Sequence, residues 1–301
     1  MRIVSILEDV NFEKRIAITP EIAKKYIALG CELSLSENYG EHLGFKDKEY
    51  KELGVKISKD DKEIINSADV IVQLGLLPND KISSIKANQT LIGVFNPYDN
   101  NSKIDDLVKN KINIFSLELL PRITRAQSMD ILSSQANLAG YKAVIESFAS
   151  FEKAIPMMMT AAGTVPAAKV LVVGAGVAGL QAIATAKRLG AIVSATDVRD
   201  ASKEQVESLG GKFLTVDQSE NLETKGGYAK EVSEDFKKKQ AEMMKDALKK
   251  NDIVICTALI PGKPATPAPM TKTFAAGTVP AAVIIIGIAF SNSYIESTTD
   301  L

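Results

Sequence analysis

The feature that most constrains the fold is an apolar run that leads into a glycine-rich loop and then into a helical pattern. The run is KVLVV at 169–173, and Gly174, Gly176 and Gly179 follow it in the spacing GxGxxG. The first glycine permits a tight turn, the second lets backbone approach a pyrophosphate, and the third lets helix and strand pack closely. The pattern predicts a strand, a phosphate-binding loop and a helix at 177–189.

A carboxylate follows where such a unit needs one, which strengthens a glycine spacing that is weak by itself. Asp197 ends the second predicted strand, at 191–196, about 20 residues after the loop, and can accept hydrogen bonds from both ribose hydroxyls. Arg199 would suit a 2′-phosphate, but the carboxylate would repel a phosphate in the same pocket. The sequence therefore favours NAD over NADP. A nucleotide-binding fold that holds no nucleotide is the alternative.

Short β-rich runs alternate with helical patterns along the rest of the chain. They are RIVSIL, CELSLS, ADVIVQL, QTLIGVF and INIFSLEL in the first half, and DIVICTAL at 252–259 in the second. This alternation predicts parallel βαβ units, and 301 residues exceed what one core usually organises. A helical pattern over 128–151 separates the halves. We expect an α/β protein with two Rossmann-like, doubly wound parallel-sheet domains, 1–136 and 137–301, joined by that long helix.

Composition excludes several classes of function. Lys plus Arg (36) balances Asp plus Glu (37), which argues against a nucleic-acid partner. Cys31 and Cys256 lie in apolar runs and are expected to be buried free thiols, and the single histidine, His42, is expected in a loop or on the surface. These residues cannot assemble an ordinary zinc site, so no metal is expected. The longest apolar run, 279–290, is too short to span a bilayer, and no signal peptide is predicted, so we expect a soluble chain.

A second polar segment, RITRAQSMDILSSQANLAG at 122–140, lies at the start of the predicted long helix. It brings together Arg122, Arg125, Gln127 and Asp130, with no histidine or cysteine nearby to transfer a proton. By spacing alone, helix capping and solvated charge would explain these residues. Further on, a long polar segment with two glycines precedes Tyr228, which would close over a bound cofactor if the segment is a lid and would otherwise belong to a plain loop.

Several longer motifs resemble one family. They are LELLPRITRAQSMDILSSQANLAGY, PMMMTAAGTVPAAKVLVVGAGVAGLQAIATAKRLGA, ATDVR, KEQVESLGGKF, GGYAKE, KKKQAE and TALIPGKPA. Together they resemble the NAD(H)-binding component, domain I, of proton-translocating nicotinamide nucleotide transhydrogenase, which lies in the alpha subunit or in the first piece of a split alpha subunit. The resemblance is dense from about 117 to 264, looser over 1–116, and poor over the last forty residues.

The resemblance implies a reaction that explains the missing proton-transfer residue. In that family hydride passes directly from NADH on this component to NADP⁺ on a partner, so the protein positions two rings and needs no general acid or base. The residues implied to orient the nicotinamide are Arg122, Gln127, Asp130 and Ser133. Further implied cofactor contacts are Ser128, Met129, Gly174, Gly176, Val177, Gly179, Asp197, Val198, Arg199, Gly227, Tyr228, Gln240 and Leu259.

The resemblance also implies partners and a location. NADP(H)-binding and membrane-spanning transhydrogenase subunits would carry out the remaining steps, including proton translocation, and this component would be a homodimer. It would lie in the cytoplasm, peripheral to the inner membrane through its partners.

Two other functions remain open from the sequence. Alanine dehydrogenase shares the RIAITPE opening with Arg15, but it needs a lysine and a histidine where this chain has Gln73 and the Phe95–Asn96 pair. An inactive or sensing NAD-binding module is the non-enzymatic alternative.

The C-terminal end departs from the family pattern. The eight residues AAGTVPAA occur at 161–168 and again at 275–282. We expect the C-terminal region to be shortened, with lower stability and exposed apolar surface around 279–290.

Overall fold

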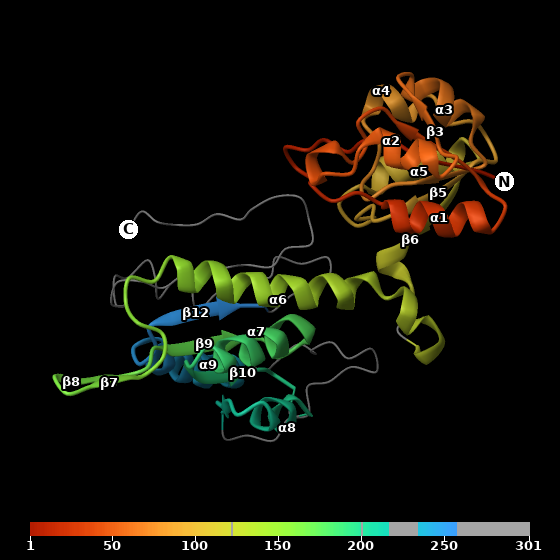
Figure 1. The fold of residues 1–301 in the computed structure, drawn as a ribbon. Coiled ribbons are helices and arrows are strands. Elements are labelled where there is room, and N and C mark those ends of the chain that lie inside the picture. Colours follow the sequence, from red (N-terminus) through yellow and green to blue (C-terminus); the bar gives the residue numbers. More distant parts are fainter. Residues whose placement is uncertain (122, 200, 217–233, 258–301) are drawn as a thin grey trace. The chain divides into compact units, whose positions relative to one another are not determined.

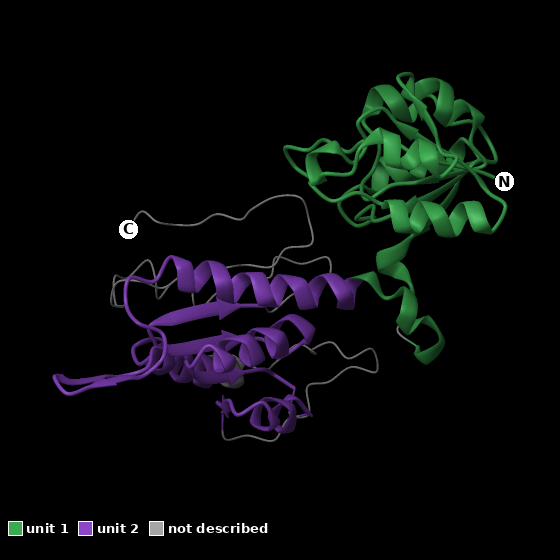
Figure 2. Ribbon diagram, viewed as in Figure 1, with its two compact units in different colours: residues 1–131 green, residues 132–301 purple. Residues whose placement is uncertain are grey.

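The structure is a computed structural model that describes residues 1–121, 123–199, 201–216 and 234–257, with side chains omitted at 234–237. The chain divides into two compact units, residues 1–131 and 132–301 (Figure 2). The predicted domain boundary at 136/137 lies a few residues beyond this division, and both positions fall within the helix Ile131–Ala149. Each unit contains an α/β sheet of its own (Figure 1), as the sequence predicted.

The first unit contains a six-stranded parallel sheet in the order β3-β2-β1-β4-β5-β6. Its strands are β1 (Arg2–Ser5), β2 (Glu32–Ser36), β3 (Lys56–Ser58), β4 (Val70–Val72), β5 (Thr90–Gly93) and β6 (Asn113–Ser116). Its helices are α1 (Pro20–Ala28), η1 (Glu41–Leu43), α2 (Asp47–Glu52), α3 (Asp61–Ser67), α4 (Asn79–Ile82), α5 (Asn101–Lys109), η2 (Leu117–Leu119) and η3 (Thr124–Met129). The strand order is that of a doubly wound nucleotide-binding fold.

Helices cover both faces of this sheet, and the alternation of side chains along each strand fills two cores. Ile3 packs in a cluster with Leu33 and Tyr50, whereas its neighbour Val4 packs in another with Ile71. Successive residues of a strand point to opposite faces, so a strand that is covered on both sides is apolar at nearly every position. This is why RIVSIL shows no polar alternation.

The second unit contains a four-stranded parallel sheet in the order β11-β10-β9-β12. Its elements are β9 (Lys169–Val173), α7 (Val177–Arg188), β10 (Ile192–Thr196), α8 (Ala201–Ser208), β11 (Lys212–Phe213), α9 (Glu234–Leu248) and β12 (Ile253–Cys256). Strand β9 lies between β10 and β12. The chain therefore proceeds from β9 to β10 and β11 on one side and then returns to β12 on the other side, so the strand order reverses at β9. Ligands of such sheets bind beyond the carboxyl ends of the strands at this reversal.

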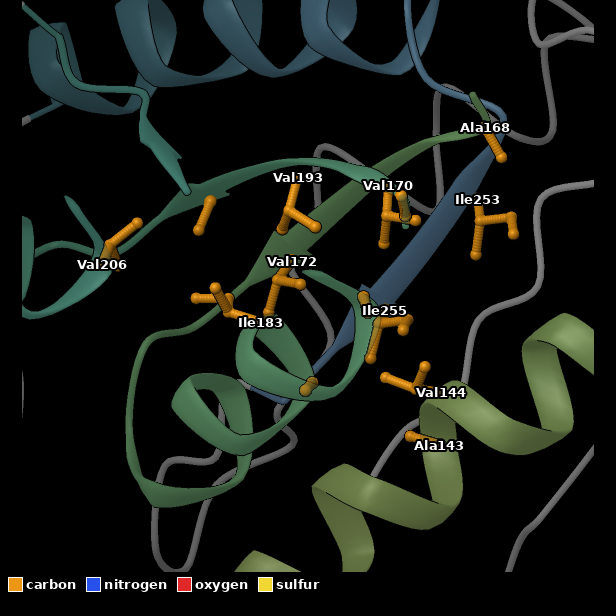
Figure 3. Close-up of a cluster of buried hydrophobic side chains, with 14 of the residues drawn as sticks. Ala143, Val144, Ala168, Val170, Val172, Ile183, Val193, Val206, Ile253 and Ile255 are labelled. Atoms are coloured by element: carbon orange, nitrogen blue, oxygen red, sulfur yellow. The ribbon is translucent and has the colours of Figure 1, made fainter. Parts of the chain in front are cut away.

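The core of the second unit is built on β9. Val170 and Val172 face a cluster that includes Val144 of α6 (Ile131–Ala149) and Ile183 of α7 (Figure 3). Leu171 and Val173, pointing the other way, pack against the apolar side of α9. The sheet is therefore held between α6 and α7 on one face and α9 on the other, which fixes the position of the loop after β9.

One local prediction was wrong in detail, and one element was missed. The predicted helix over 128–151 begins at Ile131, because residues 124–129 form the 3-10 helix η3. The sequence analysis did not predict the antiparallel hairpin of β7 (Met158–Thr160) and β8 (Gly163–Val165). Strands of three residues in a segment rich in glycine and proline give too short a pattern to recognise.

One thiol differs in detail from the prediction, whereas the histidine lies on the surface as expected. Cys256 is buried in β12, but Cys31 precedes β2 and is half-buried, and neither forms a disulfide within the described residues. His42 lies exposed in η1, where Nε2 is 2.7 Å from the Lys14 carbonyl oxygen. No helix in the described part of the chain is both long and apolar enough to cross a membrane. The apolar run at 279–290, for which exposed surface is expected, lies outside the described residues.

Candidate functional site

The glycine loop has the geometry that its sequence predicted. Gly174 has a φ of +95°, which L side chains rarely adopt, and its N–H donates to the Thr196 carbonyl at 2.8 Å. A β-carbon built on Gly179 would lie 1.8 Å from the Gly174 carbonyl oxygen, so only glycine lets α7 approach the strand this closely. The loop is thus fixed between the ends of β9 and β10, with the first turn of α7 beside it.

Gly176 differs from the other two glycines, because neither its φ nor its surroundings require glycine. It caps α7 with φ −77° and ψ −166°, which any residue adopts, and no side chain caps the helix. A β-carbon there would meet only the Arg199 Nη2 atom, at 4.0 Å. Nothing within the described part of the protein therefore demands glycine at 176. A ligand that approaches the backbone at the N-terminus of α7 would demand it.

Asp197 lies at the end of β10 with its carboxylate almost fully buried. Oδ2 accepts the Ala175 N–H at 2.7 Å and Arg199 Nη2 at 3.0 Å, while Oδ1 accepts Arg199 N and Nε, each at 2.9 Å. Burial raises the pKa of this carboxyl, but the hydrogen bonds from Arg199 and Ala175 outweigh it and hold the pKa below its ordinary value. Asp197 is therefore ionised at neutral pH.

The pairing with Arg199 limits what Asp197 can accept. A carboxylate offers about four lone-pair sites, and the four bonds to Arg199 and Ala175 occupy that number. A ribose hydroxyl can bind only if the Arg199 side chain releases one of its bonds. The Arg199 side chain also lies beside the loop, since Nη2 is 4.0 Å from the position of a β-carbon built on Gly176.

Thr257, which the sequence prediction missed, contacts the same loop from the end of β12. Its hydroxyl donates to the Gly174 carbonyl oxygen at 2.8 Å, and its N–H donates to the Val173 carbonyl at 2.8 Å. Thr257 begins the motif TALIPGKPA, but the motif does not indicate this contact, because only the pairing of β12 with β9 brings the threonine to the loop.

Helix α6 contacts the first turn of α7 through a second close approach. A β-carbon on Gly140 would lie 2.1 Å from the Ala178 carbonyl oxygen. Gly140 is buried because α6 and α7 touch here backbone to backbone.

The residues predicted to orient a nicotinamide lie just before and at the start of α6. Gln127, Ser128 and Met129 are exposed in η3, and Asp130 follows as its C-cap, half-buried. Ser133 is half-buried in the first turn of α6, in the second unit. Among the other predicted contacts, Val177 and Val198 flank the loop and Asp197, and Gln240 is half-buried in α9. Arg122, Gly227, Tyr228 and Leu259 lie outside the described residues.

In the first unit, the strand order reverses between β1 and β4, and there side chains following the two strands are hydrogen-bonded to each other. Gln73 is buried, accepting from Ser5 Oγ at 3.0 Å and from the Ile6 N–H at 2.8 Å, and donating to Glu8 Oε1 at 3.1 Å. Glu8 Oε1 also accepts the Leu74 and Gly75 N–H groups, at 2.7 and 3.3 Å. Burial raises the pKa of Glu8 against these bonds. A buried neutral amide thus lies where the strand order reverses.

Two family models match the chain. Residues 6–139 match the N-terminal domain of "Alanine dehydrogenase/PNT" and residues 143–289 match its C-terminal domain. The second match extends to residue 289, past the last of the sequence motifs, which ends at Ala265.

Similar proteins narrow the assignment. The first piece of the split NAD(P) transhydrogenase subunit alpha of Rhodospirillum rubrum is 51% identical over 280 residues, which cover 91% of this chain and 73% of the relative. This chain belongs to the NAD(P) transhydrogenase alpha-subunit family. Among solved structures, the transhydrogenase from Sinorhizobium meliloti superposes with a TM-score of 0.78 at 41% identity, over 94% of this chain and 77% of that one. L-alanine dehydrogenase, at a TM-score of 0.74 and 19% identity over 96% and 74% of the two chains, shares the fold.

Proposed function

We propose that the chain is the NAD(H)-binding component of a proton-translocating transhydrogenase, and that it exchanges hydride between NAD(H) and NADP(H) held by a partner subunit. The observation that carries the proposal is the open backbone at Gly176. This residue lies in a glycine loop that is held by hydrogen bonds, beside the ionised Asp197. Membership of the transhydrogenase alpha-subunit family supports an oxidoreductase that uses a nicotinamide nucleotide.

A dinucleotide fits these residues. Its pyrophosphate would lie against Gly174 and Gly176, where the N-terminus of α7 offers N–H groups and positive potential. Its ribose would bind Asp197 in exchange for part of the Arg199 pairing. Because the Asp197 carboxylate is ionised and buried beside the loop, a 2′-phosphate would be repelled, and we therefore propose NAD(H) as the cofactor.

When bound, the nicotinamide supplies the hydride, and the protein's contribution is to orient it. We assign this role to Gln127, Asp130 and Ser133, with Arg122 from the segment before them. Amide, carboxylate and hydroxyl groups can hold a carboxamide and a ribose without transferring protons. Orientation of this kind is sufficient for a direct transfer between two rings.

The partner subunits would carry NADP(H) and the membrane-spanning path, so that proton translocation belongs to them. The name "NAD(P) transhydrogenase subunit alpha", which a relative from Haemophilus influenzae carries, agrees with an assembly of several chains. We propose a homodimer located in the cytoplasm and peripheral to the inner membrane through these partners.

Oxidation of an amino acid is the competing function, and the first unit disfavours it. That reaction needs a group to accept the substrate's proton, but between β1 and β4 lies the amide of Gln73, hydrogen-bonded to Ser5, Ile6 and Glu8. An inactive NAD-binding module is the second alternative, and only turnover distinguishes it from the proposal.

A turnover experiment separates the three functions. The purified chain is mixed with the NADP-binding partner subunit, NADH and thio-NADP⁺, and the reduced thio-nucleotide is followed by its absorbance. We expect reduction that depends on both proteins. In parallel, the chain alone is given NAD⁺ and L-alanine. NADH formation in that reaction would identify an alanine dehydrogenase, while NADH binding without turnover in either reaction would identify a binding module.

A further inference from the structure

One peptide group of the glycine loop is held from both sides. The peptide between Gly174 and Ala175 accepts the Thr257 hydroxyl at its carbonyl oxygen, at 2.8 Å, and donates from its N–H to Asp197 Oδ2, at 2.7 Å. Asp197 comes from the end of β10 and Thr257 from the end of β12, on either side of β9. Two strand ends thus fix the plane of a single peptide at the start of the loop.

Backbone pairing places the Thr257 hydroxyl. The Thr257 N–H donates to the Val173 carbonyl at 2.8 Å, continuing the ladder in which Cys256 pairs with Val173. The side chain therefore starts from a fixed backbone position one residue past the strand. Its second carbonyl neighbour, Val173 O, is 3.4 Å away, so the Gly174 carbonyl is the principal acceptor.

The held carbonyl also contacts the helix that follows the loop. A β-carbon on Gly179 would lie 1.8 Å from the Gly174 oxygen and 2.9 Å from Thr257 Oγ1. A change in the orientation of the Gly174 carbonyl would thus move either the loop or the first turn of α7. Both carry the N–H groups that would meet a pyrophosphate.

We propose that Thr257 is a positioning residue for the pyrophosphate of the bound dinucleotide, acting by fixing the Gly174–Ala175 peptide before the ligand arrives. The inference rests on the proposed function, since it assumes that the loop binds NAD(H). Pre-organising a site avoids ordering it during binding, which is how a residue that touches no ligand raises affinity. Asp197 has a matching second role, because one of its oxygens holds the other side of the same peptide.

The test compares Thr257→Val, which removes the hydroxyl at nearly constant shape, with Thr257→Ser, which keeps it. Dissociation constants of the full chain are measured by calorimetry for NADH and ADP-ribose, which contain a pyrophosphate, and by competition for adenosine, which contains none. We expect Thr257→Val to weaken NADH and ADP-ribose roughly fivefold to tenfold, the effect of one lost hydrogen bond. Thr257→Ser should bind both within about twofold of the unchanged chain, and adenosine should be little affected.

Thermal unfolding of each variant shows whether it folds, and if Thr257→Val does not, Thr257→Ala is compared with Thr257→Ser in the same way. Wild-type affinity for NADH in the Thr257→Val variant, or equal weakening of adenosine, would overturn the role of Thr257 and leave the proposed function standing. Failure of the unchanged, folded chain to bind NADH would overturn both.

Discussion

Replacing Gly176 with alanine separates the needs of the ligand from the needs of the fold. The backbone of Gly176 adopts φ −77°, which suits alanine, and the new β-carbon would meet no described protein atom nearer than Arg199 Nη2 at 4.0 Å. Alanine caps a helix less well than glycine, by up to about 1 kcal/mol, but it restricts the unfolded chain, which restores about 0.4–1 kcal/mol. We expect the two effects nearly to cancel, with a change in Tm below about 3 °C.

The same methyl group should interfere with a pyrophosphate. A backbone N–H binds a phosphate oxygen at about 2.9 Å, whereas carbon and its neighbours pack at about 3.5 Å or more. The ligand would have to withdraw by several tenths of an ångström and lose one or two charge-assisted hydrogen bonds, each contributing roughly 1.5–3 kcal/mol. We predict a loss of NADH affinity of about tenfold to a hundredfold.

NADH fluorescence titration and thermal unfolding of the same preparation test this pair of expectations. Gly179→Ala provides the contrast, because its β-carbon would lie 1.8 Å from the Gly174 carbonyl oxygen and should reduce stability as well as binding. Unchanged NADH affinity in folded Gly176→Ala would refute the placement of the pyrophosphate at this loop.

Three further predictions concern stability. Gly140→Ala should destabilise the second unit by about 1–3 kcal/mol in chemical denaturation, since its β-carbon would lie 2.1 Å from the Ala178 oxygen; the exposed control Asn137→Ala in the same helix should be near neutral, and a more stable Gly140→Ala would contradict the close packing. Asp197→Asn should lower the free energy of unfolding by about 2 kcal/mol at neutral pH. Because folding lowers the pKa of Asp197, its contribution to stability is present above the unfolded pKa of 3.8 and is lost as pH falls through the folded pKa. The difference in unfolding free energy between variant and parent should therefore shrink below about pH 4 and stay constant from about pH 5 to 8. Tyr39→Phe should destabilise the first unit by about 1–3 kcal/mol, since the Tyr39 hydroxyl accepts the Ala17 and Ile18 N–H groups, and an unchanged denaturation midpoint would exclude this role.

Much of the second unit could be predicted from the sequence because its signals are local. The strand 169–173, the glycine spacing and Asp197 lie within one βαβ unit, where chain order and spatial order coincide. The bidentate pairing of Asp197 with Arg199 also lies within three residues. Its consequence is that the acceptor sites of the carboxylate are already occupied, and this depends on the orientation of both side chains, which the sequence does not give.

Other features depend on contacts between distant segments. Thr257 reaches Gly174 only because β12 pairs with β9, and Gly140 meets Ala178 only because α6 packs on α7. Neither residue belongs to a type or spacing that marks a loop clamp or a helix contact. The start of α6 was predicted too early because the preceding 3-10 helix, η3, is short. Over so few residues its apolar spacing cannot be distinguished from that of an α-helix.

Isotope transfer tests the central claim most directly. NADH carrying deuterium at both C4 positions is mixed in ordinary water with NADP⁺, the chain and its NADP-binding partner, and the NADPH formed is analysed by mass spectrometry. Direct exchange between two nicotinamides, held by side chains that transfer no protons, predicts one deuterium in every NADPH. NADPH that carries hydrogen from the solvent, or none formed while NADH is demonstrably bound, would contradict it.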